Sequence, residues 1–118
     1  MRSRSKNILV KGRDLVSGIP KTIDVRSDEI RQALKDSVKR ILEVVKDALE
    51  STPPELSSDI IDRGILVAGG GAQLRGLDQV IREKTNVRCN VVEDPHLAIV
   101  KVCGKIIEDL EKYKHVLL

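Results

Sequence analysis

A short, unbroken apolar run that ends in three glycines is the feature that most constrains the fold of this chain. Residues 65–68 are Ile-Leu-Val-Ala, and Gly69-Gly70-Gly71-Ala72 follows directly. A continuous apolar run of this length is typical of a strand that is buried on both faces, as in a parallel sheet. The pattern therefore predicts a buried parallel strand whose carboxyl end opens into a glycine loop.

The residues after the loop complete a βαβ unit. Apolar residues three and four positions apart predict a helix over residues 74–84, and alternating apolar residues predict a second strand over residues 87–91. Asp94-Pro95 then turns the chain, and another apolar stripe predicts a last helix over residues 97–110. Two strands joined through one helix are parallel, so the fold class is α/β.

The residues before the run predict a β-hairpin and two helices. A turn signal at residues 17–20 separates two short strands. Ser27 is the expected N-cap of a helix over residues 28–51, whose apolar stripe has the spacing of one helical face. Thr52-Pro53-Pro54-Glu55 ends that helix and begins another that runs to Asp62.

Charge and composition narrow the function classes. Residues 1–27 hold seven Lys and Arg against two Asp, a net of +5, whereas residues 28–118 carry −2. The basic arm is either a solvated terminus or a contact for phosphate or a membrane surface. One Tyr and no Phe or Trp count against binding of single-stranded nucleic acid. We expect no membrane-spanning helix. The two cysteines do not form a disulfide framework, which indicates a protein of the reducing cytoplasm.

The glycine loop is the leading candidate for a binding site. Ligands of open α/β sheets bind at the carboxyl ends of the strands, and glycines let a ligand approach the backbone closely. The amides of the loop and of the following helix are donors for an anion or a sugar oxygen. The loop matches neither the Walker A motif nor the dinucleotide fingerprint. A tight strand-to-helix turn without a ligand explains the same glycines.

The other candidates are polar or sulfur-containing side chains that form no recognisable set. They are Asp59, Asp62, Arg63, Cys89, His96, Lys101, Cys103 and Lys105. We expect surface ion pairs among the first three, small core residues at the two cysteines and solvated lysines. A metal site at His96 is not expected, because no second His or Cys lies at ligand spacing. No catalytic residue is predicted.

Five segments, in this order, resemble the C-terminal part of MreB, the family of rod-shape-determining bacterial actin homologues. They are GRDLVSGIP at 12–20, TPPEL at 52–56, DRGI at 62–65, GGGA at 69–72 and LRGLD at 74–78. The resemblance runs from residue 11 to residue 108. It implies part of the actin/Hsp70 ATPase fold, which is ribonuclease H-like, and filaments beneath the membrane that organise cell-wall synthesis.

The resemblance also implies a division of the chain and a site. Residues 1–10 would be a disordered or non-family leader, and residues 11–27 a hairpin from the smaller subdomain of the second lobe. Residues 28–118 would be the C-terminal half of the larger, nucleotide-holding subdomain. Gly69, Gly70, Gly71 and Ala72 would contact the adenosine of ATP. The phosphate loops, the Mg²⁺ site and the catalytic half have no counterpart, so we expect a truncated product without ATPase activity of its own.

The partners implied are further copies of the chain, full-length MreB-like subunits and a RodZ-like membrane adaptor. We expect no nucleic acid, no direct membrane insertion, and a cytoplasmic protein that reaches the membrane through its partners. One departure is in the last helix, where Val100, Val102 and Gly104 replace a pattern of Ala-x-Gly-x-Gly. Two other functions stay open: a stand-alone nucleotide-binding module, and a binder of nucleic acid or acidic surfaces through the basic arm.

Overall fold

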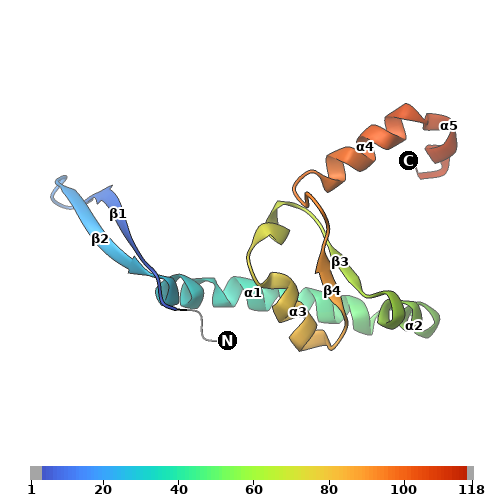
Figure 1. Ribbon diagram of the computed structural model, residues 1–118, viewed down its shortest axis with the longest axis horizontal. Helices are drawn as coiled ribbons and strands as arrows, with labels where there is room; N and C mark the ends of the chain where they lie inside the picture. The colour runs from blue at the N-terminus through green and yellow to red at the C-terminus, as the bar shows by residue number, and fades with distance from the viewer. Residues whose placement is uncertain (1–3, 117–118) are drawn as a thin grey trace. The chain divides into compact units, whose positions relative to one another are not determined.

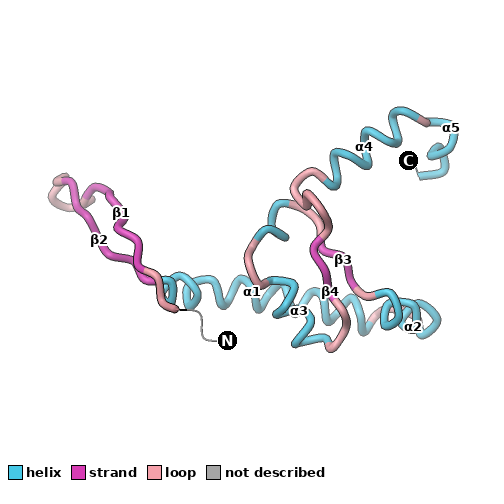
Figure 2. The backbone as a smooth tube through the Cα atoms, in the orientation of Figure 1, coloured by secondary structure: helices cyan, strands magenta, loops and turns pink. Residues whose placement is uncertain are grey.

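The computed structural model describes residues 4–116, which fall into two compact units (Figures 1 and 2). The first unit extends to Ile41 and the second begins at Leu42, so that one long helix, α1 (Ser27–Glu50), contributes to both. Each unit is described by itself below. None of the helices in residues 4–116 is long and apolar enough to cross a membrane.

The first unit begins with the predicted hairpin. Strands β1 (Asn7–Arg13) and β2 (Pro20–Arg26) pair antiparallel along their whole length. Residues 7–10 pair with β2 and belong to β1, so the expectation of disorder is wrong for these residues. Residues 1–3 lie outside the described part of the chain. All but one of the hairpin strand residues are exposed, so turn chemistry and backbone pairing hold it together more than burial does.

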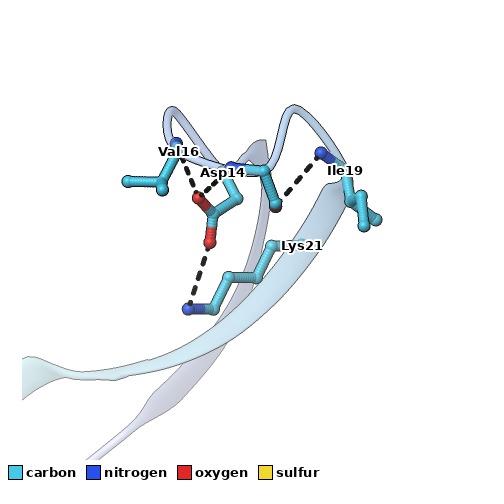
Figure 3. Close-up of polar contacts among 5 residues, drawn as sticks. Asp14, Val16, Ile19 and Lys21 are labelled. Carbon is cyan, nitrogen blue, oxygen red and sulfur yellow. Dashed lines mark hydrogen bonds and ion pairs between the residues drawn. The ribbon is translucent and has the colours of Figure 1, made fainter.

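Asp14 organises the turn between the two strands (Figure 3). Its carboxylate accepts hydrogen bonds from the backbone N–H groups of Ser17, at 3.1 Å, and Val16, at 2.8 Å. Its carbonyl accepts from the N–H of Gly18, which has a φ of +71° that favours glycine. Lys21 lies 3.9 Å from the other carboxylate oxygen. The Ser17 and Val16 amides hold the pKa of Asp14 below its ordinary value.

The start of α1 differs from the expected cap. Ser27 is the first residue of the helix, and its Oγ accepts a hydrogen bond from the backbone N–H of Lys6, 3.0 Å away. Glu29 accepts instead from the backbone N–H of Arg26 at 3.0 Å. This is the glutamate half of a capping box, while the serine hydroxyl is bonded to Lys6, just before β1. The expected N-cap role of Ser27 is therefore wrong, because the segment before β1 takes its hydroxyl.

The second unit alternates helices and short strands. After the end of α1 its elements are α2 (Pro54–Arg63), β3 (Ile65–Val67), the 3₁₀ helix η1 (Gly70–Gln73), α3 (Leu77–Thr85), β4 (Cys89–Val91), α4 (Ala98–Glu108), α5 (Leu110–Tyr113) and the 3₁₀ helix η2 (Lys114–Val116). The predicted order of elements is confirmed. The helix expected over 74–84 begins later, at Leu77, because the chain bends and turns over residues 74–76, where Gly76 has a left-handed φ of +88°.

Strands β3 and β4 are parallel, as the βαβ pattern predicts, with Ile65 opposite Cys89 and Val67 opposite Val91. Cys89 is fully buried and Ile81 of α3 is 2% exposed, so the core lies between this helix and β4. The expectation that the strand at residues 65–68 is buried on both faces is wrong. Leu66 is 71% exposed while its two neighbours are half-buried, so only one face of this strand is covered.

Gly64 sets the entry into β3. It ends α2 with a φ of +85°, and its N–H donates to the carbonyl of Ile60 at 2.7 Å. A Cβ at this position would lie 2.8 Å from the carbonyl oxygen of Arg88. That carbonyl accepts from the N–H of Ile65 at 2.7 Å, which extends the parallel pairing by one bond. A glycine is therefore required both by the backbone conformation and by the approach of the second strand.

Candidate functional site

The glycine segment leaves β3 at its carboxyl end, where the sequence places the candidate site. Gly69 has a φ of +94°, and Gly70 and Gly71 begin η1. The expected loop is therefore a single 3₁₀ turn. Ala72, at its centre, is buried and donates its N–H to the carbonyl of Gly69 at 3.1 Å. We call residues Gly69–Gln73 the glycine turn.

Only part of the backbone of the glycine turn faces outward, contrary to the expectation that all of its amides are available. The N–H of Gly69 donates to the carbonyl of Pro95 at 2.7 Å, and the N–H of Ala72 is used within the turn. The N–H groups of Gly70 and Gly71 open the 3₁₀ helix, where the first donors have no partner inside the helix. These two amides are the donors that the turn offers to a ligand.

The space beside the three glycines is open. A Cβ built on Gly69, Gly70 or Gly71 would meet no atom within 4 Å. Gly69 is needed for its backbone conformation, whereas the other two have ordinary backbone angles. Side chains at Gly70 and Gly71 would therefore fit the fold but fill the space through which a ligand reaches the backbone.

The segment after β4 lies against the glycine turn, because the carboxyl ends of parallel strands meet at one edge. Besides the Gly69–Pro95 bond, the amide nitrogen Nε2 of Gln73 lies 3.0 Å from Nδ1 of His96. Nζ of Lys101 lies 3.2 Å from a carboxylate oxygen of Asp94. The backbone of Asp94 has a φ of +46°. We call residues 94–96 the Asp-Pro-His segment. Sequence reasoning did not place His96 in the site, although its position in the loop that follows the second strand is a signal for it.

The remaining candidates lie elsewhere or are partnered. Burial raises the pKa of the Cys89 thiol, Asp78 adds to this effect and Arg82 opposes it. Cys103 is exposed, so the expectation that it is a core residue is wrong. The carbonyl of Asp62 accepts a hydrogen bond from Arg88. Within residues 4–116, no group of three His, Cys, Asp or Glu side chains is placed to hold a metal ion.

The model of the MreB/Mbl protein family matches residues 1–115. The cell shape-determining protein Mbl of Bacillus subtilis is 46% identical over 110 residues, which are 93% of this chain and 33% of that protein. The cell shape-determining protein MreB of Escherichia coli is 40% identical over 108 residues, 92% of this chain and 31% of that protein. The chain thus spans about a third of the length of these relatives.

Solved structures of similar fold agree with this family match. The crystal structure of MreB5 of Spiroplasma citri bound to ADP superposes with a TM-score of 0.85 at 30% sequence identity, covering 98% of this chain and 35% of that one. The structure of the same protein bound to AMPPNP gives a TM-score of 0.84 and covers the whole of this chain. Both neighbours therefore hold an adenine nucleotide on the fold of which this chain is a part.

Proposed function

The chain belongs to the MreB/Mbl family, and on this premise we propose that it serves in the cytoskeleton that determines bacterial cell shape, as the part of an MreB-like protein that holds adenosine. Its fold is part of the actin-like fold of that family, as the sequence predicts. The proposed contacts to the adenosine of ATP come from Gly69, Gly70, Gly71 and Ala72. The observation that carries the proposal is the open glycine turn at the carboxyl edge of β3 and β4.

The chemistry of the glycine turn suits a nucleoside. Two backbone N–H groups that lead a 3₁₀ turn are neutral donors, which suit ribose hydroxyls and the acceptor nitrogens of a base. Without side chains at Gly70 and Gly71 a flat ligand can lie directly on the backbone. The buried methyl group of Ala72 and its bond to Gly69 also hold the turn in shape.

We propose that the chain does not hydrolyse ATP by itself. Phosphoryl transfer needs a metal ion and donors that converge on the γ-phosphate. In the family pattern these come from the first lobe and the phosphate loops, for which the sequence offers no matching motif. When bound, ATP would supply its adenosine to the glycine turn, and a Mg²⁺ ion would need ligands from elsewhere.

The exposed apolar side chains of the second unit support a proposal about binding partners. Ile99 and Ile107 of α4 and Leu66 of β3 are largely exposed, which is costly for an isolated monomer. We propose self-association, or assembly with full-length MreB-like subunits, as the means of covering this surface, with a RodZ-like adaptor as the link to the membrane. The proposed location is the cytoplasm. We propose that the hairpin of residues 11–27 is a remnant of the smaller subdomain of the second lobe. We propose also that residues 28–118 are the C-terminal half of its larger, nucleotide-holding subdomain.

The test is a titration of the ¹⁵N-labelled chain with ATP, followed by NMR. We expect the amide resonances of Gly69–Ala72 to shift with a weak, millimolar affinity, because only the adenosine side of a site is offered. Gly71→Val fills the open space and should weaken binding by about tenfold, which corresponds to roughly 1.4 kcal/mol. Gly12→Val is the matched control, since a Cβ at Gly12 of the hairpin also meets no atom within 4 Å.

Two results would contradict the proposal. One is the absence of shifts in the glycine turn at saturating ATP. The other is equal binding by Gly71→Val and the parent chain, which would place the nucleotide elsewhere. Submicromolar affinity would instead favour the stand-alone nucleotide-binding module.

A further inference from the structure

A polar pair, Gln73 and His96, joins the end of the glycine turn to the Asp-Pro-His segment and has no role in the proposed backbone contacts. Gln73 is the last residue of η1, and His96 is the last residue of the Asp-Pro-His segment. Their nitrogens, Nε2 and Nδ1, are 3.0 Å apart, and both side chains are exposed. The pair therefore bridges the two segments that meet at the carboxyl edge of the sheet.

Besides the contact between Gln73 and the His96 ring, two bonds hold the Asp-Pro-His segment that carries His96. The N–H of Gly69 donates to the carbonyl of Pro95, the residue before His96, at 2.7 Å. On the same segment, the carboxylate of Asp94 pairs with Lys101. With Nδ1 engaged by Gln73, the imidazole keeps its Nε2 atom and its ring face for another partner.

The imidazole is also the one aromatic side chain that the chain offers near this edge. The sequence has one Tyr, no Phe and no Trp. Tyr113 lies in α5, beyond the far end of α4, and an 11-residue helix is about 16 Å long. A flat purine ring gains from stacking on an aromatic face or from a hydrogen bond to its edge, and His96 can supply either.

We propose that His96, held by Gln73, contacts the purine ring of the adenosine bound on the glycine turn. This inference rests on the proposed function and adds a side-chain contact to the base. Gln73 is a positioning residue, because it acts through the imidazole. The purine would then lie between the backbone of Gly70 and Gly71 and the imidazole of His96.

The test uses the whole chain and adenosine, which lacks phosphates and so probes this part of the site alone. His96 and His115 are the only two histidines, so their ring resonances are readily assigned with the variants His96→Ala and His115→Ala. On titration with adenosine we expect the His96 ring resonances to shift together with the amides of Gly69–Ala72, while those of His115 stay. His96→Ala should weaken adenosine binding several-fold, and His115→Ala should leave it unchanged.

The role of Gln73 has its own readout. In Gln73→Ala the His96 ring should respond less to adenosine, although the amides of Gly69–Ala72 still shift when adenosine is added. Gln73→Glu should restore the response, because a carboxylate accepts from the N–H that a histidine can carry at Nδ1.

The outcomes separate the two proposals. If the glycine amides shift and the His96 ring does not, the inference is overturned and the proposed function stands. If ribose alone moves the His96 ring as adenosine does, the contact is to the sugar and the inference is again overturned. If the glycine amides do not respond to adenosine or to ATP, the proposed function fails and the inference fails with it.

Discussion

The two β-structures of this chain are stabilised in opposite ways. The β1–β2 hairpin joins residues that are close in sequence, and all but one of its strand residues are exposed. The β3–α3–β4 unit pairs Ile65 with Cys89 across an intervening helix and buries Cys89 and Ile81. A hairpin can be specified by its turn, whereas a parallel pair must recover the entropy of a long loop closure through buried contacts.

The difference has a consequence for where substitutions are tolerated. In the hairpin, polar atoms at the turn determine the geometry and the apolar side chains around it are exposed to water. In the β3–α3–β4 unit, a few buried apolar side chains and one glycine determine whether the strands meet. Two single substitutions, one change of pH and one double substitution test this contrast.

Ile81→Ala should have the largest effect. Ile81 is 2% exposed in α3, and truncating a buried aliphatic side chain costs about 2–5 kcal/mol. We expect rapid amide hydrogen exchange at Ile65 and Val92, which bond across the parallel pair, with no change at Gly18 in the hairpin. Ile61→Ala in α2 is the matched control, since Ile61 is 66% exposed and should change stability by less than about 0.5 kcal/mol. Equal losses of stability in Ile81→Ala and Ile61→Ala would contradict the conclusion that buried side chains hold the β3–α3–β4 unit together.

Gly64→Ala should have the next largest effect and lower the free energy of unfolding by about 1–3 kcal/mol. The new Cβ would lie 2.8 Å from the Arg88 carbonyl oxygen, at a φ of +85°. We expect a lower urea midpoint and loss of exchange protection at Ile65. Gly104→Ala is the control within α4, where a Cβ meets nothing within 4 Å and an alanine should stabilise the helix by about 0.5–1 kcal/mol. A stable Gly64→Ala variant would mean that β4 can move away from β3.

The sequence predicts the elements well because their signals are local. The turn at residues 17–20, the prolines before α2 and the apolar stripes of the helices place each element within a few residues. The glycine run after the strand also locates the candidate site, and the five motifs identify the family.

The errors have physical causes in tertiary contacts. The apolar residues 65–68 predict burial on both faces, but Leu66 is exposed because burial depends on what else packs against the strand. Ser27 is a poor guide to the cap, since Lys6 competes for its hydroxyl. The spacing of metal ligands along the chain gives no signal for His96, because its contact with Gln73 joins residues 23 positions apart.

Lowering the pH should loosen the hairpin turn and leave the β3–α3–β4 unit intact. The Ser17 and Val16 amides hold the pKa of Asp14 below its ordinary value, so its charged form is favoured in the fold. That contribution is present above the unfolded pKa, about 3.9, and is lost as the pH falls through the lower folded value. We expect faster exchange at the Val16 and Ser17 amides in that window. Asp14→Asn keeps an acceptor oxygen but cannot titrate, so its turn should show no such transition; a transition in Asp14→Asn would assign the effect to another group.

Replacing Leu15 and Val16 together by serine should have the smallest effect. These side chains are 98% and 99% exposed, so their removal from the turn gives up almost no buried apolar area, and we expect a change below about 0.5 kcal/mol. Amide exchange at Gly18 should be unchanged, because its bond is to the backbone of Asp14. The substitution removes the same kind of aliphatic side chain as Ile81→Ala, so the pair isolates burial as the cause. A loss as large as that of Ile81→Ala would mean that the turn packs against another molecule in solution, and sedimentation at increasing dilution would then detect its release.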